Sequence, residues 1–329
     1  MANTRQAPLG SGFTAASTAD DVVTDVDLDG RTALVTGGYS GLGLETTRAL
    51  VKVGARVLVP ARRPDVARAR LEEIDGFDRV TVVPMDLADL ASVRAAADQL
   101  LESESTLDVA IAAAGVMAAP ERRVGPGWES QFATNHLGHY VLVNLLFPLL
   151  TSADGARVVS YSSAGHFLSD IRWDDMQFEH GYDKWQAYGQ SKTADVLFAV
   201  HLDAIAKDRG VRAFAVHPGG IITDLQRHMT AEEQIAWGWI DAEGNVVGPG
   251  FKTPSQGAAT GLWAATSPLL ENRGGVYCED CDIAPLARPG ASGKDGGVRD
   301  YAVDPQNAER LWRASAQMTG VDLIGTSAT

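Results

Sequence analysis

A glycine-rich segment between a predicted strand and a predicted helix constrains the fold of this chain more than any other feature. An apolar run begins at Thr32 and ends at Thr36, and Gly37-Gly38-Tyr39-Ser40-Gly41-Leu42-Gly43 follows it directly. Apolar residues then recur at helical spacing, and Gly54 supplies a helix stop. With the next apolar run, which ends at Val59, the segment predicts one β-α-β unit.

The same alternation of apolar runs and helical patterns continues along the chain. It predicts an α/β fold of the Rossmann type, a doubly wound parallel sheet with helices on both faces. Continuous apolar runs are typical of strands that are covered on both sides. The predicted strands are 32–36, 56–59, 80–83, 109–113, 157–161, 212–216 and 275–278.

Composition narrows the classes of partner. The 28 basic and 42 acidic side chains give a formal net charge of -14, which works against binding to nucleic acids or anionic lipids. A small-molecule partner is therefore expected. The chain starts without the basic-then-apolar order of a secretion signal, and its longest apolar stretch, 140–150, is shorter than the ~20 residues of a membrane span. We expect a cytoplasmic protein.

The residues that could bind a metal do not form a convincing set. Cys278 and Cys281 have the spacing of half a zinc site or a redox pair, but only acidic residues lie nearby, so ordinary thiols are favoured. His136 and His139 lack a third ligand at suitable spacing. We expect no metal.

The glycine-rich segment predicts a site for the pyrophosphate of a dinucleotide. Glycines allow close approach of the backbone, and the helix N-terminus presents free N–H groups, although a plain tight turn is the alternative. The second strand ends without the acid that usually binds the ribose 2′-hydroxyl; Arg62 and Arg63 stand there instead. Arg62 is expected to bind the 2′-phosphate of NADP, unless both arginines are simply solvated.

A carboxylate follows the third predicted strand, in the run Met85-Asp86-Leu87. Asp86 could accept a hydrogen bond from the adenine amino group. It could equally cap a helix that begins near Ala88. The segment is therefore a candidate for the adenine end of the cofactor.

Tyr188 and Lys192 form the candidate reaction centre. They are four residues apart, so a helix places both on one face. A nearby ammonium favours the phenolate, which suits proton exchange with an alcohol or carbonyl oxygen. The pattern is also common on ordinary helices.

Two further polar features give this pair a context. Ser162 and Ser163 follow the fifth predicted strand, at the end of the sheet where such folds bind ligands. A serine there can polarise a carbonyl oxygen, or simply form a turn. Asn135 is expected at the head of a helix, where its side chain could bind water or cap the helix.

Together these motifs resemble the short-chain dehydrogenase/reductase family in its single-domain branch, and most closely its retinol-dehydrogenase-like and protochlorophyllide-reductase-like members. The resemblance covers about residues 30–285. The matching motifs, in order, are Thr36-Gly37-x3-Gly41-x-Gly43, Asn135-His136-Leu137-Gly138-His139, Ser162-Ser163, Tyr188-x3-Lys192 and Pro218-Gly219 followed by Thr223.

The resemblance implies a role for each matching residue. Tyr188 would be the acid/base, Lys192 would hold the nicotinamide ribose and lower the Tyr188 pKa, Ser163 would orient the substrate, and Asn135 would support a proton relay through water. The implied fold is a parallel sheet of seven strands. The residues expected to bind NADP(H), with NAD(H) less favoured, are Gly37, Ser40, Gly41, Leu42, Gly43, Arg62, Asp86, Leu87, Ala114, Gly115, Tyr188, Lys192, Pro218, Gly219 and Thr223.

The chain departs from the family pattern in three places. Ala112-Ala113-Ala114-Gly115 replaces Asn-Asn-Ala-Gly after the fourth strand, which removes an amide that steadies the sheet or the cofactor. The gap between Ser163 and Tyr188 is wider than usual and is interpreted as a flap beside the substrate. Asp195 stands where these relatives often have Asn, and no function is assigned to it.

The domain prediction follows from these features. Residues 1–29 are expected to form a surface arm, and 30–329 a single NADP-binding oxidoreductase domain with insertions near 167–187 and 224–255. A homodimer or homotetramer would be in keeping with the family.

The main functional hypothesis is a carbonyl reductase or alcohol dehydrogenase that acts on a hydrophobic small molecule. A reductase of carbon-carbon double bonds and a non-catalytic NADP(H) sensor are the alternatives. Aromatic and apolar residues of the two insertions suit a large apolar substrate, or they are packing residues. They are Phe167, Ile171, Trp173, Trp185, Leu225, Met229, Ile235, Trp237 and Trp239.

Overall fold

A central sheet of eight strands organises the computed structural model, which describes residues 6–248 and 250–324. The strand order is β10-β9-β8-β7-β4-β1-β2-β3, and every neighbouring pair is parallel except β9 with β10. The strands are β1 Thr32–Thr36, β2 Arg56–Ala61, β3 Val80–Pro84, β4 Val109–Ala112, β7 Ala156–Tyr161, β8 Val211–His217, β9 Val276–Glu279 and β10 Asp282–Ile283; β5 Arg123–Val124 and β6 Trp128–Glu129 pair separately.

The predicted doubly wound sheet of about seven parallel strands is confirmed, and one short antiparallel strand, β10, is added at its edge. Asp280 and Cys281 both have positive φ values, 50° and 60°, and turn the chain back on itself. This is the backbone of a tight two-residue hairpin, and the resulting strand is too short to show any alternation in the sequence. Cys278 of β9 and Cys281 of the turn are buried free thiols.

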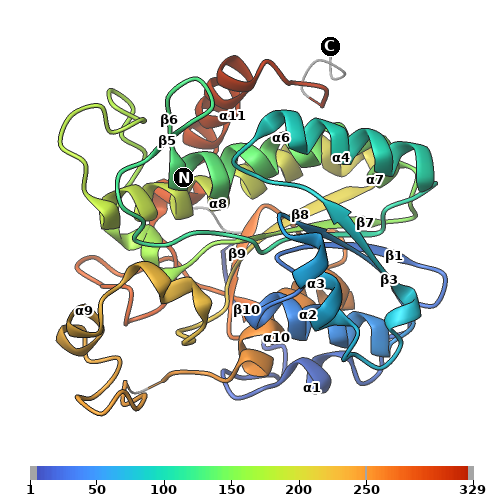
Figure 1. Ribbon diagram of the computed structural model, residues 1–329, viewed down its shortest axis with the longest axis horizontal. Coiled ribbons are helices and arrows are strands. Elements are labelled where there is room, and N and C mark those ends of the chain that lie inside the picture. Colours follow the sequence, from blue (N-terminus) through green and yellow to red (C-terminus); the bar gives the residue numbers. More distant parts are fainter. Residues whose placement is uncertain (1–5, 249, 325–329) are drawn as a thin grey trace.

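Helices cover both faces of the sheet, as Figure 1 shows. One layer contains α4, α6, α7, α8 and α11, and the other contains α1, α2, α3 and α10. Their bounds are α1 Ala19–Val23, α2 Gly41–Lys52, α3 Pro64–Leu71, α4 Leu90–Ser103, α5 Ser130–Phe132, α6 Gly138–Leu145, α7 Phe147–Thr151, α8 Lys184–Ala206, α9 Ala231–Ala236, α10 Pro254–Thr266 and α11 Pro305–Thr319.

The apolar runs of the strands follow from this three-layer arrangement. Leu34 of β1 belongs to the core under α4 to α8, whereas its neighbours Ala33 and Val35 belong to the core under α1, α2 and α10. Successive side chains of a strand point to opposite faces. Both faces are buried here, so the three central residues of the strand are all apolar.

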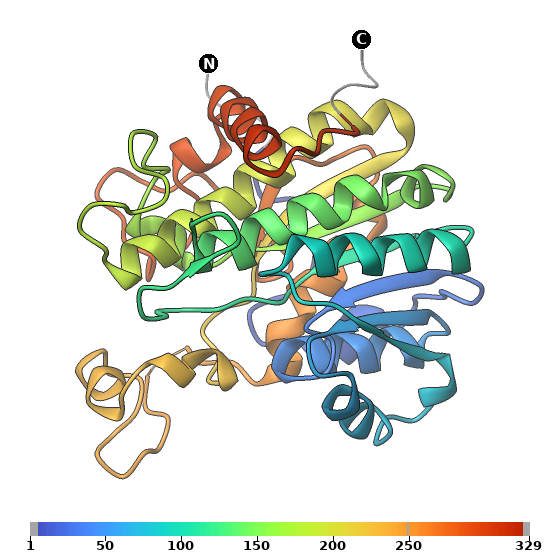
Figure 2. The same cartoon turned by 45° about the horizontal axis from the view of Figure 1, so that its top comes forward.

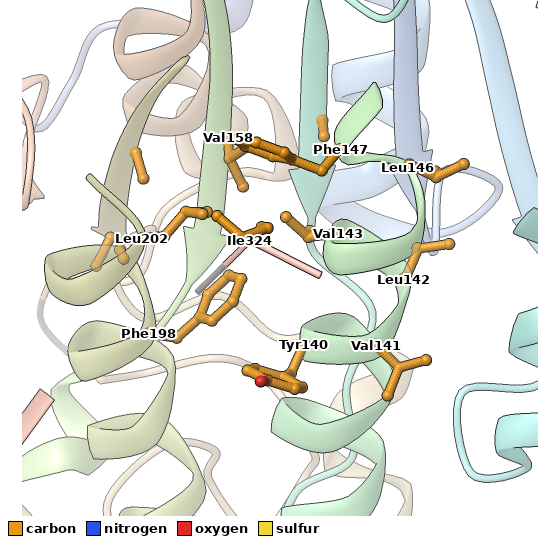
Figure 3. Close-up of a cluster of buried hydrophobic side chains, with 14 of the residues drawn as sticks. Tyr140, Val141, Leu142, Val143, Leu146, Phe147, Val158, Phe198, Leu202 and Ile324 are labelled. Carbon is orange, nitrogen blue, oxygen red and sulfur yellow. The ribbon is translucent and has the colours of Figure 1, made fainter. Parts of the chain in front are cut away.

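Aromatic rings from α6, α8 and α11 pack closely in the first of these cores. Tyr140 and Phe198 approach each other from α6 and α8 with ring centroids 6.3 Å apart, and Val158 of β7 belongs to the same buried cluster (Figure 3). Trp312 of α11 stacks on Phe198 at 5.9 Å. Helix α8 is thus held along its length, which fixes the position of the residues on its other face.

The N-terminal segment packs into the fold rather than lying loosely on it. Gln6 donates to the carbonyls of Tyr277 and Ala284 at 2.6 and 2.7 Å, and α1 buries Ala19 and Val23 against α2 and α10. Residues 1–5 of the expected arm lie outside the described residues.

The segment that carries α9 extends away from the body of the molecule (Figure 2). It corresponds to the predicted insertion near 224–255, of which residue 249 lies outside the described residues. No helix in the described part of the chain combines the length and the apolar character that crossing a membrane requires.

Candidate active site

A cleft opens at the carboxyl ends of the strands, where the strand order reverses between β1 and β4. Open α/β sheets bind ligands at this position, because the connections leave the sheet there in opposite directions. The predicted residues on its wall are Gly37, Ser40, Gly41, Leu42, Gly43, Arg62, Asp86, Leu87, Ala114, Gly115 and Thr223. A hollow of about 410 Å³ at the amino ends of β8 and β9 contains none of the predicted site residues.

The glycine segment forms a cradle that larger residues would fill. Gly37 has φ +70° and Gly41 φ +50°, in the left-handed region that favours glycine. A Cβ on Gly43 would lie 2.2 Å from the carbonyl oxygen of Gly37, so the first turn of α2 packs directly on the loop. The backbone therefore fits a pyrophosphate at the N-terminus of α2.

Thr36 and His139 form hydrogen bonds at the bottom of the cleft, beside the segment Ala112-Ala113-Ala114-Gly115, where the resemblance leads us to expect an asparagine amide. Thr36 Oγ1 accepts hydrogen bonds from the N–H groups of Ala113 and Ala114, both at 3.0 Å, and lies 2.9 Å from Nε2 of His139. Nδ1 of His139 lies 2.7 Å from the Asn135 carbonyl oxygen. A carbonyl can only accept, so Nδ1 carries the proton and the Thr36 hydroxyl donates to Nε2.

The predicted adenosine end of the cleft contains Arg62 and Asp86, and Arg62 is exposed. Asp86 Oδ1 accepts from the N–H of Ala88 at 3.0 Å, but it does not cap the following helix. That helix, α4, begins at Leu90 and is capped by Asp89, so the capping alternative for Asp86 is wrong. The Asp86 side chain lines the cleft beside Leu87.

The side chains of Tyr188 and Ser163 both lie close to Gly165. A Cβ on Gly165 would lie 2.6 Å from Cε1 of Tyr188 and 3.4 Å from Oγ of Ser163, so only glycine allows this approach. Ser162 is used elsewhere, because its hydroxyl donates to the Lys192 carbonyl at 2.7 Å. Ser163 is thus the serine placed beside the Tyr188 ring.

Lys192 lies one helical turn after Tyr188 and is buried with it, at 6% and 4% exposure. Its Nζ donates to the Tyr161 carbonyl at 2.8 Å and to Oδ2 of Asp195 at 2.9 Å, and it lies 5.8 Å from the centroid of the Tyr188 ring. The interpretation that Asp195 has no role is therefore wrong, because its carboxylate is the ion-pair partner of Lys192.

Burial acts on both members of this pair. Burial works against the Lys192 ammonium, but Asp195 and Tyr188 together raise the pKa of Lys192 above its ordinary value. Burial also raises the pKa of Asp195 to about 7, against the pull of Lys192. Lys192 is therefore charged at neutral pH, whereas Asp195 gains or loses its proton close to neutral pH.

Asn135 lies inside a continuous helical run rather than at the head of a helix. The run begins with α5, which Glu129 caps, passes through a π-helical turn at Ala133–Leu137 and continues as α6. Within this turn Asn135 bonds the loop after β4, since Oδ1 accepts from the Val116 N–H at 2.8 Å and Nδ2 donates to its carbonyl at 3.0 Å. Nδ2 also donates to Ser191 Oγ at 2.9 Å, which ties this loop to α8.

Gly115 connects the cleft with this polar centre. A Cβ on Gly115 would lie 3.2 Å from Asn135 Oδ1 and 3.8 Å from Lys192 Nζ. The inner end of the cleft therefore reaches Asn135 and Lys192. Tyr188 lies one turn before Lys192 on α8, and Ser163 lies just after the end of β7. The four predicted catalytic residues are brought together at one end of the predicted cofactor cleft.

The structure separates the apolar candidates into two groups. Trp185, Leu225, Met229 and Trp239 pack with Tyr188, and Trp237 stacks on Trp185 at 4.5 Å. In contrast, Ile171 and Trp173 belong to the core under α8, so they are packing residues and do not form a substrate wall. Phe167 lies under the guanidinium of Arg299.

The loop after β8 borders the centre. Thr223 lines the cleft and caps the turn η5 at Asp224–His228, whereas Pro218 and Gly219 lie outside the cleft wall. Beside Gly219 stands Lys252, which pairs with Asp280 at 2.6 Å.

The sequence interpretation gave no role to Asp195 and did not name Arg227 or Lys252, which also lie near the site. The i, i+3 spacing of Lys192 and Asp195 on a helix was the available signal for Asp195. Arg227 lies in the short turn η5 and Lys252 lies outside any helix or strand, so no periodicity indicates which way either side chain points.

Comparisons with known proteins show the family to which the chain is similar. Residues 31–234 match the family model described as short chain dehydrogenase. A Streptomyces antibioticus protein named "Probable oxidoreductase" is 46% identical over 87% of this chain and 97% of its own length. Retinol dehydrogenase 12 of Mus musculus is 35% identical over 91% of this chain and 89% of its own.

Solved structures show the same likeness. An uncharacterized protein from Mycobacterium paratuberculosis has a TM-score of 0.71 at 31% identity, over 94% of this chain and 99% of its own. The Pseudomonas aeruginosa RhlG/NADP complex has a TM-score of 0.60 at 25% identity, over 77% of this chain and 95% of its own.

Proposed function

This chain belongs to the short-chain dehydrogenase family, and we propose that it is an NADP(H)-dependent oxidoreductase that transfers a hydride between the nicotinamide and a carbonyl or alcohol carbon of a hydrophobic small molecule. One observation carries the proposal. Tyr188, Lys192, Ser163 and Asn135 lie close together, and Gly115 of the cleft wall lies next to Asn135 and Lys192.

The residues of the cleft fit the cofactor. The glycine cradle leaves room for a pyrophosphate, and Arg62 stands where an acid would be expected for NAD. The solved structure of RhlG is an active-site complex with NADP, which supports the same preference. When bound, the nicotinamide supplies or accepts the hydride.

The side chains of the protein then move and hold protons. In reduction, the Tyr188 hydroxyl gives its proton to the substrate oxygen, and the Ser163 hydroxyl donates a hydrogen bond to the same atom. The Lys192 ammonium stabilises the phenolate that remains. Asn135 keeps the loop after β4 against α8, so that these groups retain their relative positions.

The substrate is proposed to be apolar because of what surrounds Tyr188. The Tyr188 ring packs in one apolar cluster with Met117, Met229 and Trp185. This apolar surface continues along the 224–255 insertion with Trp237 and Trp239. Aromatic and thioether side chains bind apolar molecules of varied shape.

Substitution of Tyr188 by phenylalanine tests the proposal. The change removes one hydroxyl and leaves the ring, so NADPH should bind as in the wild type while kcat falls by about 10²- to 10⁴-fold. Tyr182→Phe is the matched control: its hydroxyl donates to the Ala119 carbonyl at 2.8 Å, outside the reaction centre. Retained turnover in Tyr188→Phe would refute the acid/base role.

A screen of NADPH oxidation over aldehydes, ketones, steroids and terpenoids, repeated with NADH, would supply the substrate for this test. An α,β-unsaturated ketone in the panel distinguishes the two enzyme classes by its product. An allylic alcohol supports carbonyl reduction, whereas a saturated ketone supports reduction of the double bond. Binding of NADPH without turnover on any member would favour the sensor.

A further inference from the structure

Two arginines from distant parts of the chain line the cofactor cleft. Arg62 follows β2, and Arg227 belongs to the turn η5 in the loop after β8. Both line the cleft together with Tyr39 and Ser40 of the glycine segment. In a chain with a net charge of -14, this local concentration of positive charge requires an explanation.

Neither guanidinium forms an ion pair with a carboxylate of the described residues. Within this part of the chain, Arg227 makes one hydrogen bond, from Nη1 to the Asp224 carbonyl at 2.9 Å. Partial desolvation and then the charge of Arg62 lower the pKa of Arg227, although its side chain remains exposed, and Asp224 and Tyr39 oppose this only in part. The two cations therefore repel each other across the cleft, and an anion between them would relieve the repulsion.

The backbone of Arg227 is held in this position. Thr223 and Gln226 form a capping box, in which the Thr223 N–H donates to Gln226 Oε1 at 2.8 Å. The buried Gln226 also donates to the Ile221 carbonyl at 2.8 Å. A Cβ on Gly41 would lie 3.3 Å from Cγ2 of Thr223, so this turn rests on the glycine segment.

We infer that Arg227 is a specificity-determining residue that binds the 2′-phosphate of NADP(H) opposite Arg62. The inference rests on the proposed NADP(H) dependence and adds a second contact from the other side of the cleft. Two guanidiniums can surround a phosphate with charge-assisted hydrogen bonds that one cannot supply from a single direction. The turn also carries Leu225, which packs toward Tyr188, so one short segment touches both the cofactor and the substrate ends.

Calorimetric binding of 2′,5′-ADP and of 5′-AMP to the full chain tests this assignment without any turnover. The two probes share the adenosine and the 5′-phosphate and differ in the 2′-phosphate. Arg227→Met and Arg62→Met keep an apolar stem and remove the charge. Arg63→Met is the matched control, because Arg63 adjoins Arg62 and is exposed but does not line the cleft.

The expected result has three parts. The wild type binds 2′,5′-ADP at least 10-fold more tightly than 5′-AMP. Arg227→Met and Arg62→Met each weaken 2′,5′-ADP binding at least 10-fold and change 5′-AMP binding less than 2-fold. Arg63→Met behaves as the wild type. Thermal unfolding of each variant, all altered at exposed positions, shows whether it is folded.

Other results separate the failure of this inference from the failure of the proposed function. If Arg62→Met loses the preference and Arg227→Met matches Arg63→Met, the role of Arg227 is refuted and NADP(H) dependence stands. If Arg227→Met weakens both probes equally, its specificity role is refuted as well. If the wild type binds both probes equally, the NADP(H) preference itself fails.

Discussion

Replacement of Thr36 by valine would test whether the Thr36 hydroxyl steadies the loop after β4 in place of the missing asparagine amide. Thr36 is 1% exposed, and its Oγ1 accepts from the N–H groups of Ala113 and Ala114 while donating to His139. Valine has nearly the same shape, so the packing of β1 changes little. Three hydrogen bonds disappear, and a buried imidazole nitrogen loses its donor.

The expected cost can be worked out from those bonds. A typical intramolecular hydrogen bond contributes ~0.5–1.5 kcal/mol, so Thr36→Val should lower the free energy of unfolding by about 2–4 kcal/mol. Thr47→Val is the matched control, because Thr47 is equally buried and its Oγ1 makes one bond, to the Gly38 carbonyl at 2.8 Å. Its expected cost is about 1 kcal/mol.

Urea unfolding of the wild type and both variants at pH 7.5 measures these differences. Calorimetry with NADPH measures the second consequence, which is weaker binding by Thr36→Val because Ala113 and Ala114 form the floor of the cleft. A loss of stability in Thr36→Val no larger than that in Thr47→Val would refute the reasoning, since it would mean that the Ala113 and Ala114 N–H groups do not depend on this hydroxyl.

Two further predictions concern pH. Above about pH 7 the Asp195 carboxylate offsets the charge of Lys192. In Asp195→Asn this offset is lost and Lys192 acts on the reaction centre with its full charge, so the pH at which alcohol oxidation reaches half its maximal rate should fall by about one unit. An unchanged pH profile would contradict the pairing of Asp195 with Lys192. Burial lowers the pKa values of His136 and His217 to about 3 and of His139 to about 4, below the unfolded value of about 6.5. The unfolded chain then binds more protons, so stability is complete above about pH 6.5 and falls toward pH 4, by about 2 kcal/mol per histidine at pH 5; equal urea midpoints at pH 7.5 and pH 5 would count against this.

Much of the fold was predictable because local patterns carry it. Strands that are buried on both faces are mostly apolar and helices repeat every 3.6 residues, so the seven parallel strands were found with ends displaced by one or two residues at most. The β-hairpin end of the sheet was missed, since β10 has only two residues. The π-helical turn at Asn135 was also missed, because its hydrogen-bond shift leaves no mark in residue type.

Local spacing along the chain established the glycine segment between strand and helix and the pairing of Tyr188 with Lys192 on one face of α8. Both depend on residues within a few positions of each other, whose geometry the backbone of a strand or helix sets almost alone. The approach of Ser163 to Tyr188 over Gly165, the bonds of Asn135 to the loop after β4, and the meeting of Arg227 with Arg62 required the folded chain. These contacts join segments far apart in sequence, and their distances follow from how whole helices and loops pack on the sheet, which no short pattern encodes.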